Sequence, residues 1–282
     1  MLIALDSLPW PWGEDVLAFL FMAAAFVRPR RLRRAVTWAS AQRADRPWRL
    51  AAAVCAFRGR WVARWRLLGL HSPEQLRRSL AVEGEEHLIG VEGGAILLEF
   101  HLGPPGVELP LKLLRHEVRH VGWHDRSAAA GWWSDAWRPI MVSDELSNAA
   151  QDPRKWPAVL YKARQTLLDG GKICIMADSE EGQEVFRVPL PGGPMVIRAG
   201  WLTLHRLTGA PVLPVLTHLR GRRQILTIHP PLPTRESDPA RRLEVWRDII
   251  TSLVVDYVGR FPEQCPMPAL VYHYDLAWPG RP

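Results

Sequence analysis

His101 and Glu108 are two residue types that act together in acid–base chemistry. An imidazole beside a carboxylate makes a general base, because the acid fixes the tautomer of the ring and stabilises its cation. His101 directly follows Ile96–Phe100, a short and mostly apolar run with glycines before it and a Gly/Pro-rich loop after it. This pattern predicts a buried strand with His101 at its C-terminal end, where ligands bind in open α/β sheets.

Four other segments of the chain have a recognisable pattern. Gly170–Asp178 (GGKICIMAD) places glycines before an apolar strand and an acid after it, and Leu207–Val215 (LTGAPVLPV) leads into another apolar strand. Val188–Gly192 (VPLPG) is a Pro/Gly loop, and Phe261–Gln264 (FPEQ) lies near the C-terminus. Each segment is weak evidence alone, but the four in this order are specific.

Together with His101, these segments resemble the glycerolipid acyltransferase superfamily and, within it, the bacterial lipid A late acyltransferases. The resemblance runs from about Leu80 to Gln264. That family carries H-x4-E or H-x4-D after a buried strand, whereas six residues, including Pro104-Pro105, separate His101 from Glu108 here. The resemblance implies an α/β fold in which helices flank a layered, mostly parallel sheet.

The resemblance also implies an O-acyltransferase. Such an enzyme moves a fatty acyl group from acyl-CoA or an acyl carrier protein to a hydroxyl of a lipid or glycolipid, with no metal or other cofactor. His101 is then the general base and Glu108 its partner. A rival interpretation is a homologue that binds lipid without turnover, and a His101–Glu108 distance within about 3.2 Å would favour the enzyme.

Five further residues are candidates for substrate binding. Asp178 ends a predicted strand whose segment lines the site in the family, although an acid there can also simply cap the loop that follows. Arg187, Arg198 and Arg126 can hold a phosphate of the acyl donor or acceptor, although arginines are more often solvated. Gly103 lies in the loop after His101, whose backbone amides, like those at the start of the Glu108 helix, can stabilise an oxyanion.

Strand and helix patterns alternate from about residue 90 onward. The predicted strands are Ile96–Phe100, Val118–Trp123, Ile173–Ala177, Val212–Thr217 and Ile225–His229. The predicted helices are Ser72–Ile89, Glu108–Arg115, Trp156–Leu168, Val196–Leu207 and Pro239–Val258. This alternation independently favours an α/β fold with a largely parallel sheet.

The segment His116–His120 matches H-E-x-x-H, the helical zinc motif of metalloproteases. There His116 and His120 would bind zinc, Glu117 would be the general base, and a third ligand would come from His124 or Asp125. The residues around the motif favour a strand over 118–123, which would separate the two histidines by about 13 Å. The same stretch contains a second H-x4-D, from His120 to Asp125, without the strand-then-helix setting of His101.

The positive charge of the chain is concentrated near the N-terminus. Between Arg28 and Arg66 there are twelve arginines and one acid, a local charge of +11, so the rest of a chain of net charge +7 carries −4. Val16–Val27 is an uncharged apolar stretch of twelve residues, about 18 Å of helix, which is too short to span a bilayer of roughly 30 Å. We expect it to insert into one leaflet while the arginines bind anionic headgroups, the alternative being a helix buried on the catalytic domain.

Trp48–Leu68 continues this basic region as a helix with one apolar stripe, which suits either a membrane interface or packing on the sheet. We divide the chain into a basic, membrane-associating helical region, residues 1–70, and a catalytic domain, residues 71–282. No nucleic-acid-binding motif accompanies the arginines. Three cysteines without C-x-x-C spacing favour a reducing compartment. The expected location is the cytoplasmic face of the inner cell membrane, as a peripheral or monotopic protein.

Overall fold

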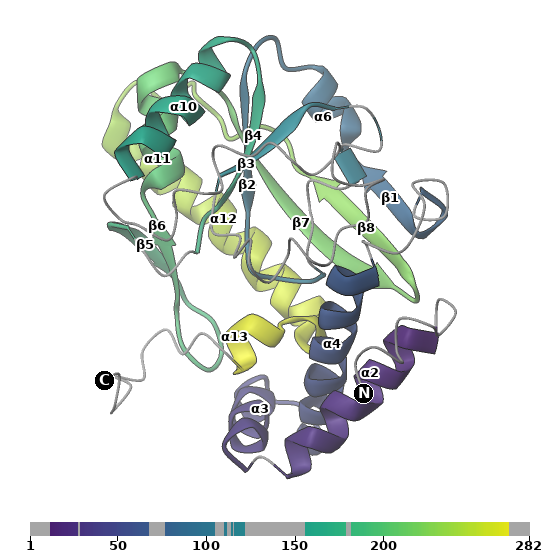
Figure 1. The fold of residues 1–282 in the computed structure, drawn as a ribbon. Coiled ribbons are helices and arrows are strands. Elements are labelled where there is room, and N and C mark those ends of the chain that lie inside the picture. The colour runs from purple at the N-terminus through teal and green to yellow at the C-terminus, as the bar shows by residue number, and fades with distance from the viewer. Residues whose placement is uncertain are drawn as a thin grey trace.

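The computed structural model describes residues 12–27, 29–67, 77–104, 110–111, 114, 116–121, 156–178 and 182–270. A six-stranded sheet lies at the centre of the molecule, with helices against both of its faces (Figure 1). Three N-terminal helices, α2, α3 and α4, lie beyond one end of this sheet (Figure 1). The α/β class predicted from the alternation of strands and helices is therefore confirmed.

Four of the six strands run in one direction, and the other two run in the opposite direction. The strands are β1 (Leu80–Glu83), β2 (Ala95–Glu99), β3 (Val118–Val121), β4 (Lys172–Met176), β7 (Val212–Arg220) and β8 (Arg223–Ile228). Their order across the sheet is β1-β8-β7-β2-β4-β3, and every neighbouring pair is parallel except the hairpin of β7 and β8. The carboxyl ends of β2, β3, β4 and β7 consequently meet at one edge of the sheet.

Strand β2 is the centre of the core, and all five of its residues are buried. Ile96 and Leu98 pack into the main core, while Ala95 and Leu97 pack into a second core on the other face, as strand alternation requires. The helices on the main-core face are α10 (Trp156–Leu168), α11 (Gly200–Thr208) and α12 (Pro239–Arg260). Leu88, from α6 (Glu85–Ile89), packs into the second core.

Two predicted helices were wrong in part. The helix predicted over 72–89 contains strand β1 and the short helix α6, which meet at Gly84 with a φ of 77°. The helix predicted over 196–207 begins only at Gly200. Residues Met195–Arg198 are strand β6, paired antiparallel with β5 (Glu184–Val188). In both places a short strand of β-branched and apolar residues gains ladder hydrogen bonds that local helical periodicity does not reveal.

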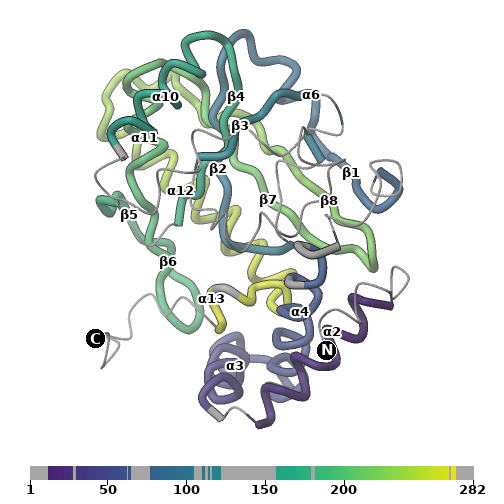
Figure 2. Tube along the Cα trace, viewed as in Figure 1, coloured from purple at the N-terminus to yellow at the C-terminus, as the bar shows by residue number. Residues whose placement is uncertain are grey.

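The N-terminal helices are α2 (Trp12–Phe26), α3 (Pro29–Ala41) and α4 (Pro47–Leu67). Two of them, α3 and α4, contribute to the core of the sheet domain. Trp38 of α3 and Val54 of α4 belong to the main core, and the Trp38 indole donates to the Pro262 carbonyl at 3.3 Å. The chain trace shows α4 beside the C-terminal segment that contains the short helix α13 (Pro266–Leu270) (Figure 2). The division at residue 70 stays a prediction.

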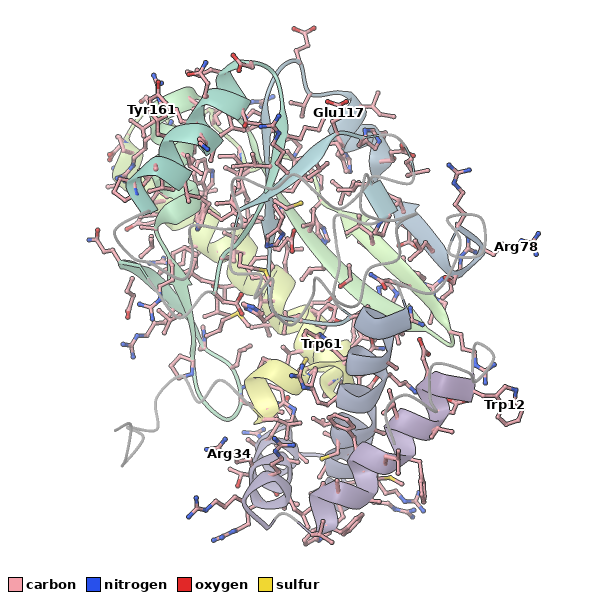
Figure 3. All side chains as sticks on the ribbon, viewed as in Figure 1. Trp12, Arg34, Trp61, Arg78, Glu117 and Tyr161 are labelled. Carbon is pink, nitrogen blue, oxygen red and sulfur yellow. The ribbon has the colours of Figure 1, made fainter. Side chains whose placement is uncertain are left out.

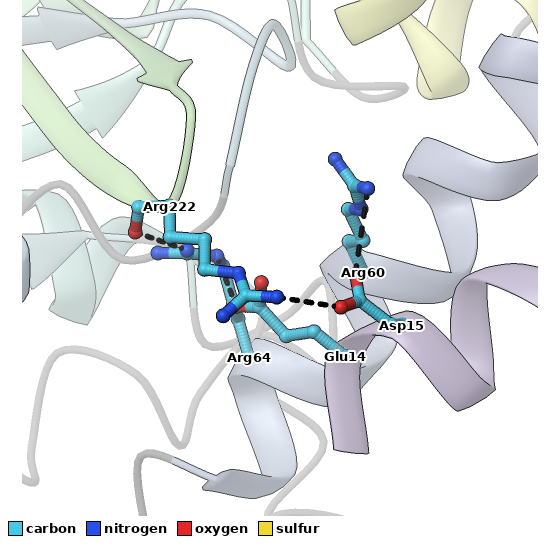
Figure 4. Close-up of polar contacts among 5 residues, drawn as sticks. All are labelled: Glu14, Asp15, Arg60, Arg64 and Arg222. Carbon is cyan, nitrogen blue, oxygen red and sulfur yellow. Dashed lines mark hydrogen bonds and ion pairs between the residues drawn. The ribbon is translucent and has the colours of Figure 1, made fainter. Parts of the chain in front are cut away.

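A buried ion pair ties α2 to α4 and to the β7–β8 hairpin (Figure 4). Arg64 Nε lies 2.7 Å from Glu14 Oε1, and Arg64 Nη2 donates to the Arg222 carbonyl at 2.8 Å. Asp15 pairs with Arg222 at 2.8 Å and with Arg60 at 3.5 Å nearer the surface. Burial raises the pKa of Glu14 and lowers the pKa of Arg64, each against the attraction of its partner. The pair therefore mainly fixes how α2 and α4 pack against the β7–β8 hairpin of the sheet.

Candidate active site

His101 and Asp178 lie beside each other at the carboxyl ends of adjacent parallel strands. The ladder of β2 and β4 pairs Glu99 with Met176, so two more residues in the same register bring His101 opposite Asp178. Both residues continue the side of the sheet on which Leu97 and Cys174 pack. The site is thus positioned by two fully paired central strands, which form because both segments are short, apolar and bounded by glycine.

Asp178 holds both the backbone and the ring of His101. One carboxylate oxygen, Oδ1, lies 3.0 Å from Nδ1 of the imidazole, and both oxygens accept from the His101 backbone N–H at 3.1 and 3.2 Å. The Asp178 side chain is fully buried, whereas 20% of the His101 side chain is exposed. A carboxylate only accepts, so Nδ1 carries the proton of the neutral ring and Nε2 is the basic nitrogen.

The surroundings of His101 favour its protonated form. Burial alone lowers the pKa of His101, but the charge and hydrogen bond of Asp178 and the charge of Glu99 together outweigh it. His120 acts in the opposite direction, and the net result is a pKa above the ordinary value of about 6.5. The imidazole is therefore a stronger base than a free histidine, and the cation formed on proton uptake is stabilised.

The turn that follows His101 is fixed by distant parts of the chain. Gly103 has a φ of 73° and donates its N–H to the Gln264 carbonyl at 2.9 Å. Thr217 of β7 donates its hydroxyl to the Pro104 carbonyl at 2.7 Å, and Tyr257 of α12 donates to the Thr217 carbonyl at 2.6 Å. The Gly103 amide is thus engaged within the protein, and its predicted contact with substrate stays a prediction.

Gln264 gives the predicted FPEQ segment a structural role. It lies in the 3-10 helix η3 (Pro262–Gln264), and its side-chain amide bonds both the N–H and the carbonyl of Leu219, at 2.7 and 3.0 Å. The residue thereby continues the pairing of β7 just beyond the level of His101. The motif was recognisable in the sequence, but this long-range contact was not.

A second carboxylate–imidazole pair lies next to the first. His120 Nδ1 of β3 lies 3.7 Å from Glu99 Oε1 of β2, and both side chains are largely buried, 12% and 4% exposed. Strand β4 separates β2 from β3, so the Glu99 side chain reaches toward His120 past β4. The sequence analysis had not singled out Glu99, because a buried acid within an apolar run has no local signature of function.

The remaining predicted site residues lie at different places. Arg198 ends β6, and its backbone N–H donates to the Ala177 carbonyl at 2.7 Å, directly beside Asp178. Arg187 is an exposed residue of the β5–β6 hairpin and pairs with Glu184 at 2.8 Å. Glu108 and Arg126 lie outside the described residues. The roles proposed for these residues in substrate binding or catalysis stay predictions.

The geometry of the H-E-x-x-H segment contradicts a helical zinc motif. Residues 118–121 form strand β3, so His116 and His120 do not lie one helical turn apart on a common face. His116 Nε2 instead lies 2.8 Å from Glu85 Oε1, while His120 approaches Glu99. Over the described ranges, no three histidine, cysteine, aspartate or glutamate side chains gather as metal ligands would. Residues His124 and Asp125 lie outside those ranges.

No family model and no curated protein matches this chain. Among solved structures, the chain is similar to the 1-acyl-sn-glycerophosphate (LPA) acyltransferase PlsC from Thermotoga maritima. The two share 17% sequence identity, the alignment covers 71% of this chain and 81% of that chain, and the TM-score is 0.39. A similarity of this extent is weak, so the function proposed below is based on the residues of the site.

Proposed function

We propose that the protein is an O-acyltransferase in which His101 is the general base and Asp178 its orienting acid. The observation that carries this proposal is the 3.0 Å contact between Nδ1 of a partly exposed imidazole and a fully buried carboxylate. The sequence resemblance to lipid A late acyltransferases supports the same chemistry. It also suggests the substrates, which are a thioester donor, either acyl-CoA or an acyl carrier protein, and a hydroxyl of a lipid or glycolipid acceptor.

In this mechanism Nε2 of His101 takes the proton of the acceptor hydroxyl while the hydroxyl oxygen attacks the thioester carbonyl carbon. Asp178 keeps the ring in the correct tautomer and stabilises the imidazolium. The tetrahedral intermediate collapses with cleavage of the carbon–sulfur bond. The leaving thiolate then takes this proton from Nε2, which regenerates neutral His101 and releases the ester and the free thiol.

Asp178 changes the role expected for Glu108. The sequence predicts Glu108 as the partner of His101, whereas a buried carboxylate that follows the neighbouring strand already lies at the Nδ1 position. The longer spacing after His101 is therefore compatible with turnover, since the orienting acid comes from another segment. A protein that only binds lipid would have no need of a partly exposed histidine whose pKa is raised by a buried carboxylate.

The test is a direct search for product. Purified protein is incubated with isotopically labelled acyl-CoA or labelled acyl carrier protein and total bacterial lipid, and labelled lipids are identified by mass spectrometry. We expect a new labelled ester that is missing when His101→Ala is used in place of the unmodified protein. Lipid binding without labelled product from either donor would favour the homologue without turnover.

We further propose that the N-terminal helices attach the protein peripherally to the cytoplasmic face of the inner membrane. Trp12, Phe19 and Phe26 recur every seven residues along α2 and are 61–65% exposed, and Figure 3 shows Trp12 pointing away from α4. The opposite face of α2 packs on α4, where Leu17 and Ala18 touch Gly59. Within the described ranges, no helix is both long enough and apolar enough to cross a bilayer. Exposed arginines of α3 would bind anionic headgroups.

A further inference from the structure

Glu99 is a buried acid that the mechanism above does not use. Glu99 is 3% exposed. It lies in the central strand β2, two positions before His101 and on the same side of the strand. Within the described part of the chain, Glu99 Oε1 accepts no hydrogen bond. Burying a carboxylate without donors is costly unless a positive charge compensates it. The acid therefore needs a partner that can be charged.

Two imidazoles supply that charge. His120 Nδ1 lies 3.7 Å from Glu99 Oε1, and the Glu99 charge also acts on His101. Among the described residues, the titratable groups that face His101 are Asp178 from the end of β4, Glu99 from β2 and His120 from β3. Two carboxylates and two imidazoles thus share one buried edge of the sheet, and each proton on one ring changes the cost of a proton on the other.

We propose that Glu99 and His120 are positioning residues of the acyl-transfer site, in which Glu99 stabilises the His101 imidazolium and His120 balances Glu99 while His101 is neutral. This inference rests on the proposed function and deepens it. As His101 takes the hydroxyl proton, a positive charge forms on its ring, and the Glu99 charge on the same side of β2 stabilises it. The site then holds a second negative charge ready for the cation, with no need to recruit one from solvent.

The coupling predicts shifts of opposite sign for two single variants. Glu99→Gln removes a charge that favours the His101 cation, so the pKa of His101 should fall. His120→Gln removes a group that disfavours this cation, so the same pKa should rise. In the double variant Glu99→Gln/His120→Gln, the pKa of His101 should lie between its values in the two single variants. If Glu99 and His120 had a purely structural role, the two variants would not shift the pKa of His101 in opposite directions.

The measurement is an NMR titration of the imidazole resonances in full-length, histidine-labelled protein. His101→Gln and His120→Gln identify the two signals by their loss. Glu85→Gln is the matched control, because it neutralises the carboxylate partner of His116 away from the site and should leave the His101 midpoint unchanged. Thermal melting of each variant checks that the fold is retained. If Glu99→Gln does not fold, the upward shift in His120→Gln tests the proposal on its own.

Kinetics then separate this proposal from the proposed function. With acyl transfer established, Glu99→Gln should lower kcat roughly three- to tenfold with little change in KM, and should move the acidic limb of the pH–rate profile to lower pH. In one outcome, the protein transfers the acyl group, while the titration midpoint of His101 stays unchanged, or shifts in the same direction, in Glu99→Gln and His120→Gln. This outcome would overturn the roles proposed for Glu99 and His120 and would leave the proposed function intact. Opposite shifts in a protein that transfers no acyl group would overturn the proposed function and retain the coupling.

Discussion

His101 and Asp178 hold equivalent positions on neighbouring parallel strands, each two residues beyond the last pair of the β2–β4 ladder. The equivalence explains why one carboxylate can bind both the backbone N–H and the ring of the same histidine. A turn residue seven positions further along the chain would need a particular loop conformation to do so. A residue on the adjacent strand is placed by the register of the sheet.

Loss of the imidazole should abolish acyl transfer without unfolding the protein. We expect His101→Ala to reduce kcat by at least about 100-fold, since general base catalysis is worth roughly 10²–10⁴. His120→Ala should retain measurable transfer, because His120 acts through Glu99 and not on the substrate. Rates with labelled acyl donor, together with circular dichroism spectra, check both variants. Retained turnover in His101→Ala, or its loss only in His120→Ala, would contradict the assignment.

The pH dependence distinguishes Asp178 from Glu108 as the partner of His101. Only neutral His101 can accept a proton, so activity should fall as pH drops through its raised pKa, above about 6.5. Asp178→Asn removes the charge that most strongly raises this pKa, so the acidic limb should move to lower pH while the maximal rate falls. Glu108→Gln should leave the limb in place. If the acidic limb of the pH–rate profile stayed in place in Asp178→Asn but moved in Glu108→Gln, Glu108 and not Asp178 would be the partner of His101.

Much of this site was present in the sequence, but the pairing within it was not. His101 and Asp178 were each predicted at a strand end, and the sheet was predicted to be parallel. The order β7-β2-β4-β3 is what makes their strands neighbours, and it brings together His101 and Asp178, which are 77 positions apart in the chain. The sequence alone therefore predicts Glu108, the first acid after His101 along the chain. Contacts between distant segments, such as Gly103 with Gln264, were unpredictable for the same reason.

The prediction of helices and strands from the sequence was limited in a similar way. Trp156–Leu168 was predicted with the bounds that the structure has, because its periodicity and length are both those of a helix. Strands β1, β5 and β6 were missed, and each is only four or five residues long. β1 is stabilised by its ladder with β8, and β6 by its ladder with β5. Segments this short contain too little periodicity to distinguish a strand from a helical turn.

Gly103 should be far less tolerant of substitution than another glycine with the same backbone conformation. Its φ is 73°, and an added Cβ would meet the Thr217 carbonyl and the Tyr257 hydroxyl. Gly209 has a φ of 70° but no described atom within 4 Å of such a Cβ. We expect Gly209→Ala to cost about 1–2 kcal/mol and Gly103→Ala about 3 kcal/mol or more, since overpacking adds to the same backbone strain.

Urea denaturation of the two variants gives these free energies of unfolding. Because the Gly103 turn directly follows His101, Gly103→Ala should also lose most of the acyl-transfer activity under conditions in which it is still folded. If the two substitutions lowered the free energy of unfolding equally, the close approach of β7 and α12 to this turn would not add to the cost of Gly103→Ala.

Glu14 and Asp15 are adjacent in α2 but should differ greatly in their effect on stability. Glu14→Gln leaves the buried Arg64 guanidinium without its counter-charge, which should cost about 3–5 kcal/mol. Asp15→Asn removes exposed pairs with Arg60 and Arg222, which should cost less than about 1 kcal/mol. The free energy of unfolding of each variant measures the difference. Similar values for the two would mean that α2 does not depend on the buried pair for its position.

Membrane attachment should depend on both the charge of α3 and the apolar face of α2. Each basic residue near an anionic surface contributes about 1 kcal/mol, so R30Q/R31Q/R33Q should weaken binding to anionic vesicles by about two orders of magnitude at low salt. The control R206Q/R241Q/R247Q removes the same charge from exposed positions on α11 and α12 and should have little effect. Vesicle co-sedimentation at rising salt measures this electrostatic part of the affinity.

The apolar part of the attachment is tested by replacing two exposed aromatic residues of α2. Phe19→Ser and Phe26→Ser together should weaken binding to vesicles of every composition and should not alter the fold, because both side chains are more than 60% exposed. Substitution tests this better than deletion of residues 1–27, which would also remove Glu14 and leave Arg64 buried without its partner. If vesicle binding survives both the arginine and the phenylalanine variants in high salt, the attachment site lies outside α2 and α3. Trp48, which is 62% exposed at the start of α4, would then be the next residue to replace.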